Sequence, residues 1–163
     1  MVEAVKDILK VENLHVRFDS REGVIKAVNG VNLTLQEDSI VALVGESGSG
    51  KTMTALSIMG LVPNPPGEVV GGSVILDGEN ITELSDKEVR KRRSTKMGMV
   101  FQDPATSLNP TMKVGPQISE TMQLHLGYDE QTARNRTVEI LERVGIPSPE
   151  ARYYDYPYQF SGG

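Results

Sequence analysis

The chain has 163 residues, enough for one ordinary domain with its own core. Its 38% hydrophobic and 24% charged residues are typical of a soluble globular protein, and no apolar run approaches the roughly 18–20 residues that span a bilayer. The net charge of −5 argues against a nucleic acid partner, and the lack of cysteine excludes disulfides, thiolate metal sites and a cysteine nucleophile.

The first part of the chain has the pattern of an α/β protein. Loose apolar/polar alternation predicts strands at Ile8–Phe18 and Val24–Leu35, each with one wet face. The segment Ser39–Gly45 is almost continuously apolar, which predicts a strand buried on both faces in a parallel sheet. Helical spacing follows at Gly50–Leu61, and a further strand is predicted at Gly71–Gly78.

The remaining elements shift from strand to helix. Ser85 and Glu88 have capping-box spacing and predict a helix at Ser85–Thr95, which leads into a second buried strand at Lys96–Gln102. Two further helices are predicted at Val114–Leu126 and Asp129–Gly145. We therefore expect a β and α/β part over residues 1–102 and a helical part over residues 103–163.

One motif carries chemistry. The segment "GESGSGKT" fits G-x-x-x-x-G-K-[ST] and lies between a predicted buried strand and a predicted helix, as this motif requires. Glycines let the backbone N–H groups point inward at phosphate oxygens, and the helix adds its positive N-terminal end. Lys51 supplies a cation for the β- and γ-phosphates, and the Thr52 hydroxyl is a ligand for Mg²⁺. The predicted fold class is thus a P-loop NTPase of the α/β type, but the motif alone does not separate ATPases, GTPases and kinases.

Two later segments narrow this choice. "VFQDPATSLNP" and "YPYQFSGG" follow the phosphate motif in order, and with it the chain resembles the ATP-binding subunits of ABC importers, in the dipeptide/oligopeptide or nickel branch. The resemblance implies an ABC ATPase core with an antiparallel β part and a helical subdomain. It also implies that the chain stops inside the signature motif, so that the fold is incomplete at its C-terminus.

The resemblance assigns roles to single residues. Gln102 would be the catalytic glutamine that reaches both Mg²⁺ and the attacking water, so it joins Thr52 as a metal ligand. Phe18 would stack on adenine; its alternative is an ordinary β core residue. Ser161, Gly162 and Gly163 would close over the γ-phosphate of a second subunit. With Phe18 and these three, the expected ATP-binding residues are Gly45, Glu46, Ser47, Gly48, Ser49, Gly50, Lys51 and Thr52.

The same resemblance implies cofactors and partners. ATP and Mg²⁺ are the expected cofactors. The expected partners are ABC permease subunits, which dock on the segment after Gln102, and a second ATPase subunit in a head-to-tail dimer. The expected location is peripheral, at the cytoplasmic face of the cell membrane.

The resemblance also implies that the general base for ATP hydrolysis stands in an Asp-Glu pair at the end of an apolar strand. No apolar tetrapeptide followed by Asp-Glu occurs in the 163 residues, so we predict that this chain binds nucleotide at most and hydrolyses ATP negligibly by itself. Three interpretations stay open: a peptide-importer ATPase subunit, a nickel-importer subunit, and a non-transport ABC ATPase.

Overall fold

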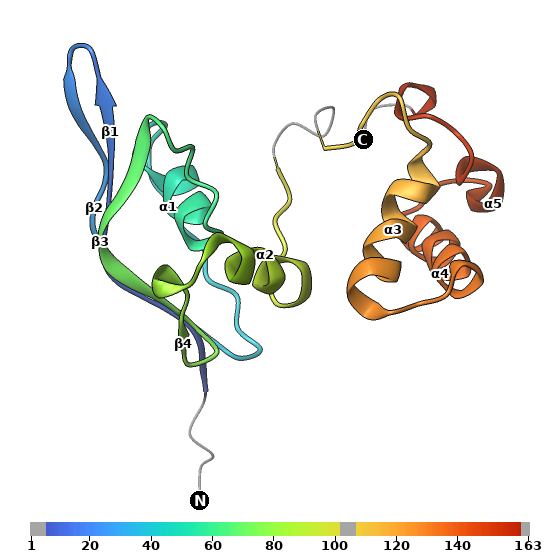
Figure 1. The fold of residues 1–163 in the computed structure, drawn as a ribbon, viewed down its shortest axis with the longest axis horizontal. Helices are drawn as coiled ribbons and strands as arrows, with labels where there is room; N and C mark the ends of the chain where they lie inside the picture. Colours follow the sequence, from blue (N-terminus) through green and yellow to red (C-terminus); the bar gives the residue numbers. More distant parts are fainter. Residues whose placement is uncertain (1–5, 102–106, 161–163) are drawn as a thin grey trace, which may run out of the picture. The chain divides into compact units, whose positions relative to one another are not determined.

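The structure is a computed structural model that describes residues 6–101 and 107–160. It divides into two compact units, Met1–Arg93 and Ser94–Gly163, each of which is described by itself. Figure 1 shows the sheet in the first unit and helices in the second. In the described ranges, no helix is both long enough and apolar enough to cross a membrane.

The first unit is built on a four-stranded antiparallel sheet. Strands β1 (Asp7–Ser20) and β2 (Gly23–Gln36) form a hairpin, β3 (Gly67–Leu76) pairs with the other side of β1, and the short β4 (Glu79–Asn80) pairs with β3. The sheet order is therefore β2-β1-β3-β4. Alternating residues of β1 (Leu14 and Val16) are almost fully buried, so one face of the sheet is covered, and the two predicted strands are confirmed.

Two helices and a 3₁₀ turn complete the first unit. Helix α1 (Lys51–Ile58) contacts β1 and β2, the 3₁₀ turn η1 (Ile81–Glu83) contacts β3, and α2 (Asp86–Thr95) follows it. The hydroxyl and backbone amide of Ser85 both donate to the Glu88 carboxylate, which holds the pKa of Glu88 below its usual range. The predicted capping pair therefore exists and begins α2, although the Ser85 hydroxyl acts as a donor rather than an acceptor.

Two predicted strands are wrong. The segments 39–45 and 96–101 contain no regular secondary structure, and Ile40 and Val100 are 99% and 96% exposed. A strand persists through hydrogen bonds to its neighbours. Among the described residues the four strands pair only with one another, so these segments have no neighbour to pair with. The sequences of both segments are apolar enough for a buried strand, but a strand also needs neighbouring strands to hydrogen-bond with.

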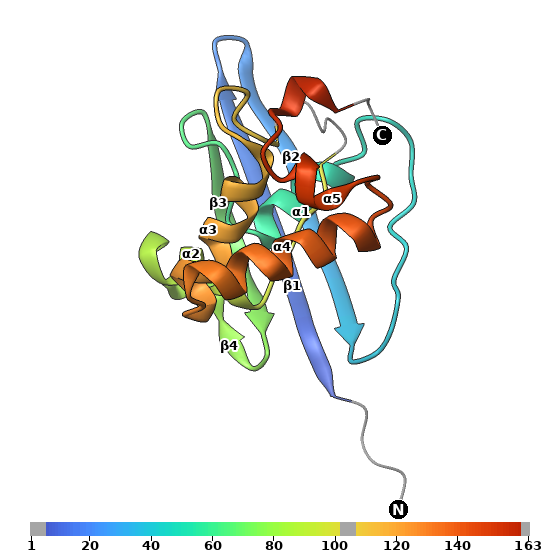
Figure 2. The same ribbon diagram turned by 90° about the vertical axis from the view of Figure 1, so that its right-hand side faces the viewer.

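The second unit consists of helices. Helices α3 (Val114–Leu126) and α4 (Glu130–Arg143) pack together, as Figure 2 shows, and are followed by α5 (Pro149–Arg152) and the 3₁₀ turn η3 (Pro157–Gln159). The bounds of α3 match the prediction. The buried stripe of α4 is Ala133, Thr137 and Leu141, whereas Val144 is 68% exposed, because the helix ends before it.

Candidate functional site

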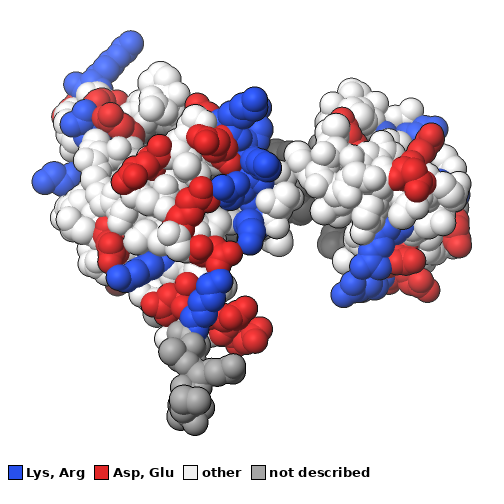
Figure 3. Space-filling view, turned by 60° about the horizontal axis from the view of Figure 1, so that its bottom comes forward, with Lys and Arg blue, Asp and Glu red and all other residues white. Residues whose placement is uncertain are grey.

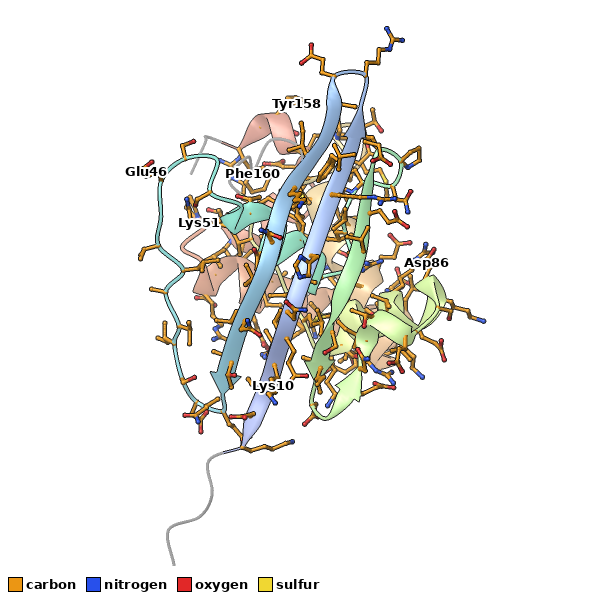
Figure 4. All side chains as sticks on the ribbon, turned by 90° about the vertical axis from the view of Figure 1, so that its left-hand side faces the viewer. Lys10, Glu46, Lys51, Asp86, Tyr158 and Phe160 are labelled. Atoms are coloured by element: carbon orange, nitrogen blue, oxygen red, sulfur yellow. The ribbon has the colours of Figure 1, made fainter. Side chains whose placement is uncertain are left out.

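The phosphate motif forms an exposed loop that ends at the first turn of α1. Figure 4 shows Glu46 at the outer bend of this loop and Lys51 where the helix begins. Residues 45–49 are exposed, and Gly50 is the N-cap of α1 with a left-handed backbone (φ 90°). Gly48 is also left-handed (φ 81°), a conformation that glycine adopts without steric cost. We call Gly45–Thr52 the phosphate loop.

The start of α1 offers backbone donors to a ligand. The first amide of the helix with a partner inside it is that of Thr54, which donates to the Gly50 carbonyl at 2.8 Å. The amides of Lys51, Thr52 and Met53 come before it, and such amides at a helix N-terminus have no intrahelical acceptor. Together with the helix dipole they favour an anion at this position.

Lys51 holds the loop in a curved shape. Its ammonium donates to the carbonyl oxygens of Gly45 at 2.8 Å and Glu46 at 2.7 Å, and to the Ser49 hydroxyl at 3.3 Å. A Cβ at Gly45 would lie only 2.8 Å from the Ser49 hydroxyl oxygen, so the loop is already closely folded here. The cation thus sits inside the loop, beside the donors that a phosphate would meet.

The two threonines of α1 have different surroundings. The Thr54 side chain is 3% exposed, and its hydroxyl donates to the Gly50 carbonyl at 3.0 Å. The Thr52 side chain is exposed, and its hydroxyl has no hydrogen bond to any residue that the structure describes. Because a hydroxyl oxygen is a hard ligand that Mg²⁺ accepts, Thr52 fits a magnesium site beside the phosphates, and Thr54 does not.

A bulge in β2 lies against the end of the phosphate loop at Gly50. Val16 pairs with Val28 and Arg17 with Lys26, so Ala27 is an extra residue on β2. The Ala27 carbonyl oxygen lies 2.5 Å from the point that a Cβ would occupy at Gly50. Only a glycine can begin α1 this close to the sheet, and the bulge therefore fixes the distance between loop and strand.

Phe18 lies on the same face of the sheet as the loop. Val28 contacts the Gly50 position and pairs with Val16, and Phe18 is two residues beyond Val16 on a stretch of β1 that pairs regularly with β3. Phe18 pairs with Ile25, two residues or about 7 Å along β2 from Ala27. Its half-buried ring packs on Gly67, where a Cβ would lie 2.7 Å from the ring edge. The ring therefore has both a packing contact and an exposed part.

Other predicted site residues lie outside the described residues. These are Gln102, Ser161, Gly162 and Gly163. Of the segment after Gln102, residues 107–113 are described, and Gln117 of α3 holds them. The Gln117 side-chain amide donates to the carbonyls of Asn109 and Met112 at 3.0 Å each, and its oxygen accepts from the Asn109 amide at 2.8 Å. Met112 beside it is 41% exposed.

Sequence reasoning missed two residues that support the loop. Ala27 contributes through its carbonyl, which no side-chain pattern reveals. Arg93 donates to the carbonyl oxygens of Met59 and Gly60 at the far end of α1, at 2.9 and 2.8 Å. Its partners lie more than thirty residues earlier in the chain, so local spacing held no signal for this contact.

Comparison with known proteins places these features in a family. A family model described as "ABC transporter" matches residues 28–163. The oligopeptide transport ATP-binding protein OppD of Bacillus subtilis is 46% identical over 98% of this chain, and OppD of Haemophilus influenzae is 48% identical over 96%. The dipeptide transport ATP-binding protein DppD of Bacillus subtilis is 43% identical over 98%. The chain spans about half the length of these relatives, at 44%, 48% and 48%.

Solved structures agree on the fold. A dimer of the ATP-binding cassette MJ0796 bound to ADP and Pi superimposes with a TM-score of 0.81 at 26% identity, over 94% of this chain and 63% of that chain. The protein cbiO1 from Clostridium perfringens, part of the ABC transporter complex cbiONQ, gives a TM-score of 0.68 at 26% identity, over 96% of this chain and 57% of that one. The predicted α/β fold of the ABC ATPase type is confirmed.

Proposed function

The chain belongs to the ABC transporter family, and we propose that it is the nucleotide-binding part of an importer subunit that couples ATP hydrolysis to uptake of di- or oligopeptides. The observation that carries this proposal is the phosphate loop, an exposed loop that holds the Lys51 ammonium against its carbonyls and ends at the first amides of α1. The peptide-transport names of its relatives favour peptides over nickel and over a non-transport role.

The loop residues would divide the work of holding ATP with Mg²⁺. The amides at the start of α1 would bind the phosphate oxygens, and Lys51 would turn its ammonium from the loop carbonyls toward the β- and γ-phosphates. Thr52 would give its hydroxyl to Mg²⁺, with Gln102 as the second protein ligand. Phe18 would stack on adenine, which is worth on the order of 1–3 kcal/mol for a base on an aromatic ring.

Partners and location follow from the family and stay proposals. A second ATP-binding subunit would approach head to tail, so that Ser161, Gly162 and Gly163 meet the γ-phosphate on the opposite loop. Permease subunits would dock on the segment after Gln102, where Met112 offers an exposed apolar side chain. The subunit would then work at the cytoplasmic face of the membrane, held there by these permeases.

Turnover is expected to need more than the loop. The 163 residues hold no Asp-Glu at the end of an apolar strand, so no carboxylate is assigned to polarise the attacking water. We therefore expect the chain to bind ATP and to release almost no phosphate. Phosphate release at the rate of intact cassette subunits would show that the base lies elsewhere in these residues.

A titration tests nucleotide binding. We expect the 163-residue chain to bind ATP with Mg²⁺ in isothermal titration calorimetry. Lys51→Met should weaken binding by at least about tenfold, because a hydrogen bond from a charged group contributes about 1.5–3 kcal/mol. Lys87→Met, which removes an exposed lysine at the start of α2, is the matched control and should bind normally. Equal affinities for the Lys51 variant and the parent would overturn the proposal.

A further inference from the structure

The C-terminal end of α1 is capped by a side chain from another helix. The last carbonyls of a helix lack intrahelical donors, and α1 ends at its C-cap Met59, which Gly60 follows. One guanidinium nitrogen of Arg93, near the end of α2, donates to both at 2.9 and 2.8 Å. A cation here also complements the negative end of the helix dipole. Arg93 therefore satisfies the end of α1 opposite the phosphate loop.

The contact between α2 and the end of α1 leaves little freedom. Gly60 has a left-handed backbone (φ 60°), and the Leu61 amide closes the helix end by donating to the Leu56 carbonyl at 2.8 Å. A Cβ at Gly60 would lie 2.8 Å from the Val89 side chain, and Val89 is only 9% exposed. Beside this contact lies a hollow of about 610 Å³ lined in part by Arg90 and Arg93.

Helix α2 is itself tied to the sheet. Arg92 makes two hydrogen bonds to the Glu79 carboxylate of β4, at 2.7 and 2.8 Å. These bonds hold the pKa of Glu79 below its usual range. Lys and Arg side chains gather on one side of this unit (Figure 3), and α2 contributes five of them. Two of the five thus serve structure: Arg92 anchors α2 to the sheet, and Arg93 connects α2 to α1.

The two ends of α1 are therefore both fixed. At the N-terminal end, Gly50 lies against the Ala27 carbonyl of β2. At the C-terminal end, Arg93 and Val89 hold Met59 and Gly60. A helix of eight residues moves nearly as a rigid body, so a shift at one end also displaces the amides and Lys51 at the other.

We propose that Arg93 is a positioning residue for the phosphate loop: by capping the far end of α1, it holds the first-turn amides and Lys51 in register for phosphate. The expected effect on ATP affinity rests on the proposed function. The claim that Arg93 fixes the position of α1 does not depend on it. Displacements of 1 Å in such donor arrays are enough to weaken binding substantially.

The test compares two basic residues of α2. Arg93→Gln removes the cap of α1, whereas Lys87→Gln removes the same charge from an exposed side chain at the start of α2. Hydrogen exchange of α1 amides and calorimetric affinity for ATP with Mg²⁺ are measured on both variants and the parent. We expect Arg93→Gln to speed exchange in α1 and to weaken ATP binding, each by about tenfold, the size expected for charged hydrogen bonds. Lys87→Gln should change neither by more than about twofold.

Each outcome decides the inference. Unchanged exchange in α1 with Arg93→Gln overturns it, and so does faster exchange with unchanged ATP affinity. If the parent binds no ATP, the proposed function fails, while exchange in α1 still decides whether Arg93 fixes the helix. Should Arg93→Gln fail to fold, Arg93→Lys takes its place. It keeps the charge, and we expect partial rescue of α1 protection; exchange and affinity equal to the parent would overturn the requirement for the paired contact.

Discussion

The carbonyl oxygen of Ala27 lies 2.5 Å from the point that a Cβ atom would occupy at Gly50. Gly50 also has a φ of 90°, which disfavours any residue with a side chain. We predict that Gly50→Ala lowers the free energy of unfolding by at least about 3 kcal/mol, since backbone strain and a clash with main chain act together. Urea unfolding monitored by circular dichroism measures this loss.

Gly48→Ala is the matched control for this change. Gly48 has a similar φ of 81°, but a Cβ there would meet nothing within 4 Å. Its cost should stay near 1–2 kcal/mol, roughly the cost of a left-handed backbone alone. If the two variants lose the same stability, the contact with the β2 bulge does not matter.

The role of Phe18 can be separated from its packing by comparing two ligands. Phe18→Leu should weaken ATP binding by roughly fivefold to a hundredfold, because base stacking is lost. It should leave binding of inorganic tripolyphosphate unchanged, since the phosphate loop is intact. Calorimetry with both ligands measures this, with Phe160→Leu in the helical unit as the control. An equal loss for both ligands would mean that Phe18 acts only as a packing residue on Gly67.

We expect the start of α4 to lose stability in acid. The Thr132 backbone amide and hydroxyl donate to the Asp129 carboxylate at 2.9 and 2.8 Å, and these bonds lower the pKa of Asp129. A depressed folded-state pKa gives stability that is full above the unfolded value of about 3.9 and is lost as pH falls through the folded value. We therefore expect the melting temperature to fall below about pH 4.

Asp129→Asn tests the assignment, because asparagine caps a helix about as well as aspartate but does not titrate in this range. This variant should melt close to the parent at pH 7 and show a smaller decrease between pH 5 and pH 3. An unchanged acid slope would place the titrating group elsewhere. Melting followed at the helical signal of circular dichroism distinguishes the two.

In the helical unit, the ring of Tyr153 packs against α3. A Cβ at Gly115 would lie 2.3 Å from this ring, and the ring hydroxyl lies 3.1 Å from the Ser119 hydroxyl. Gly115→Ala should therefore destabilise the unit by about 3 kcal/mol through overpacking. Gly127→Ala, where a Cβ meets nothing within 4 Å, should cost only about 1 kcal/mol despite its φ of 69°. Equal midpoints in urea for the two variants would contradict this packing.

Sequence patterns predicted the elements whose stability is local. The β1–β2 hairpin alternates with period two, and α3 begins and ends where its helical pattern does. The segment 39–45 was predicted as a strand but is irregular. Its apolar residues are typical of a buried strand, but none of the described strands pairs with it. The apolar pattern of a segment therefore indicates which side chains would be buried, but it does not show whether a neighbouring strand is there to pair with it.

In the candidate site, too, local features could be predicted from the sequence and distant contacts could not. The motif residues Gly45 to Thr52, which are proposed to bind phosphate, are contiguous in the sequence, so a local pattern is enough to predict them. The residues that support the loop are distant: Ala27 acts through a main-chain oxygen, and Arg93 reaches α1 from another helix. Such supports depend on tertiary contacts, and only the folded arrangement reveals them.

A hydrogen-exchange footprint tests the central claim most directly, by locating the nucleotide. Exchange is compared peptide by peptide in the 163-residue chain with and without ATP and Mg²⁺. We predict that ATP slows exchange in peptides that cover Gly45–Ser57, because the first-turn amides of α1 become hydrogen-bonded to phosphate. Exchange in α4 should be the same with and without ATP. No change over Gly45–Ser57 at saturating ATP, or protection confined to the helical unit, would contradict the account.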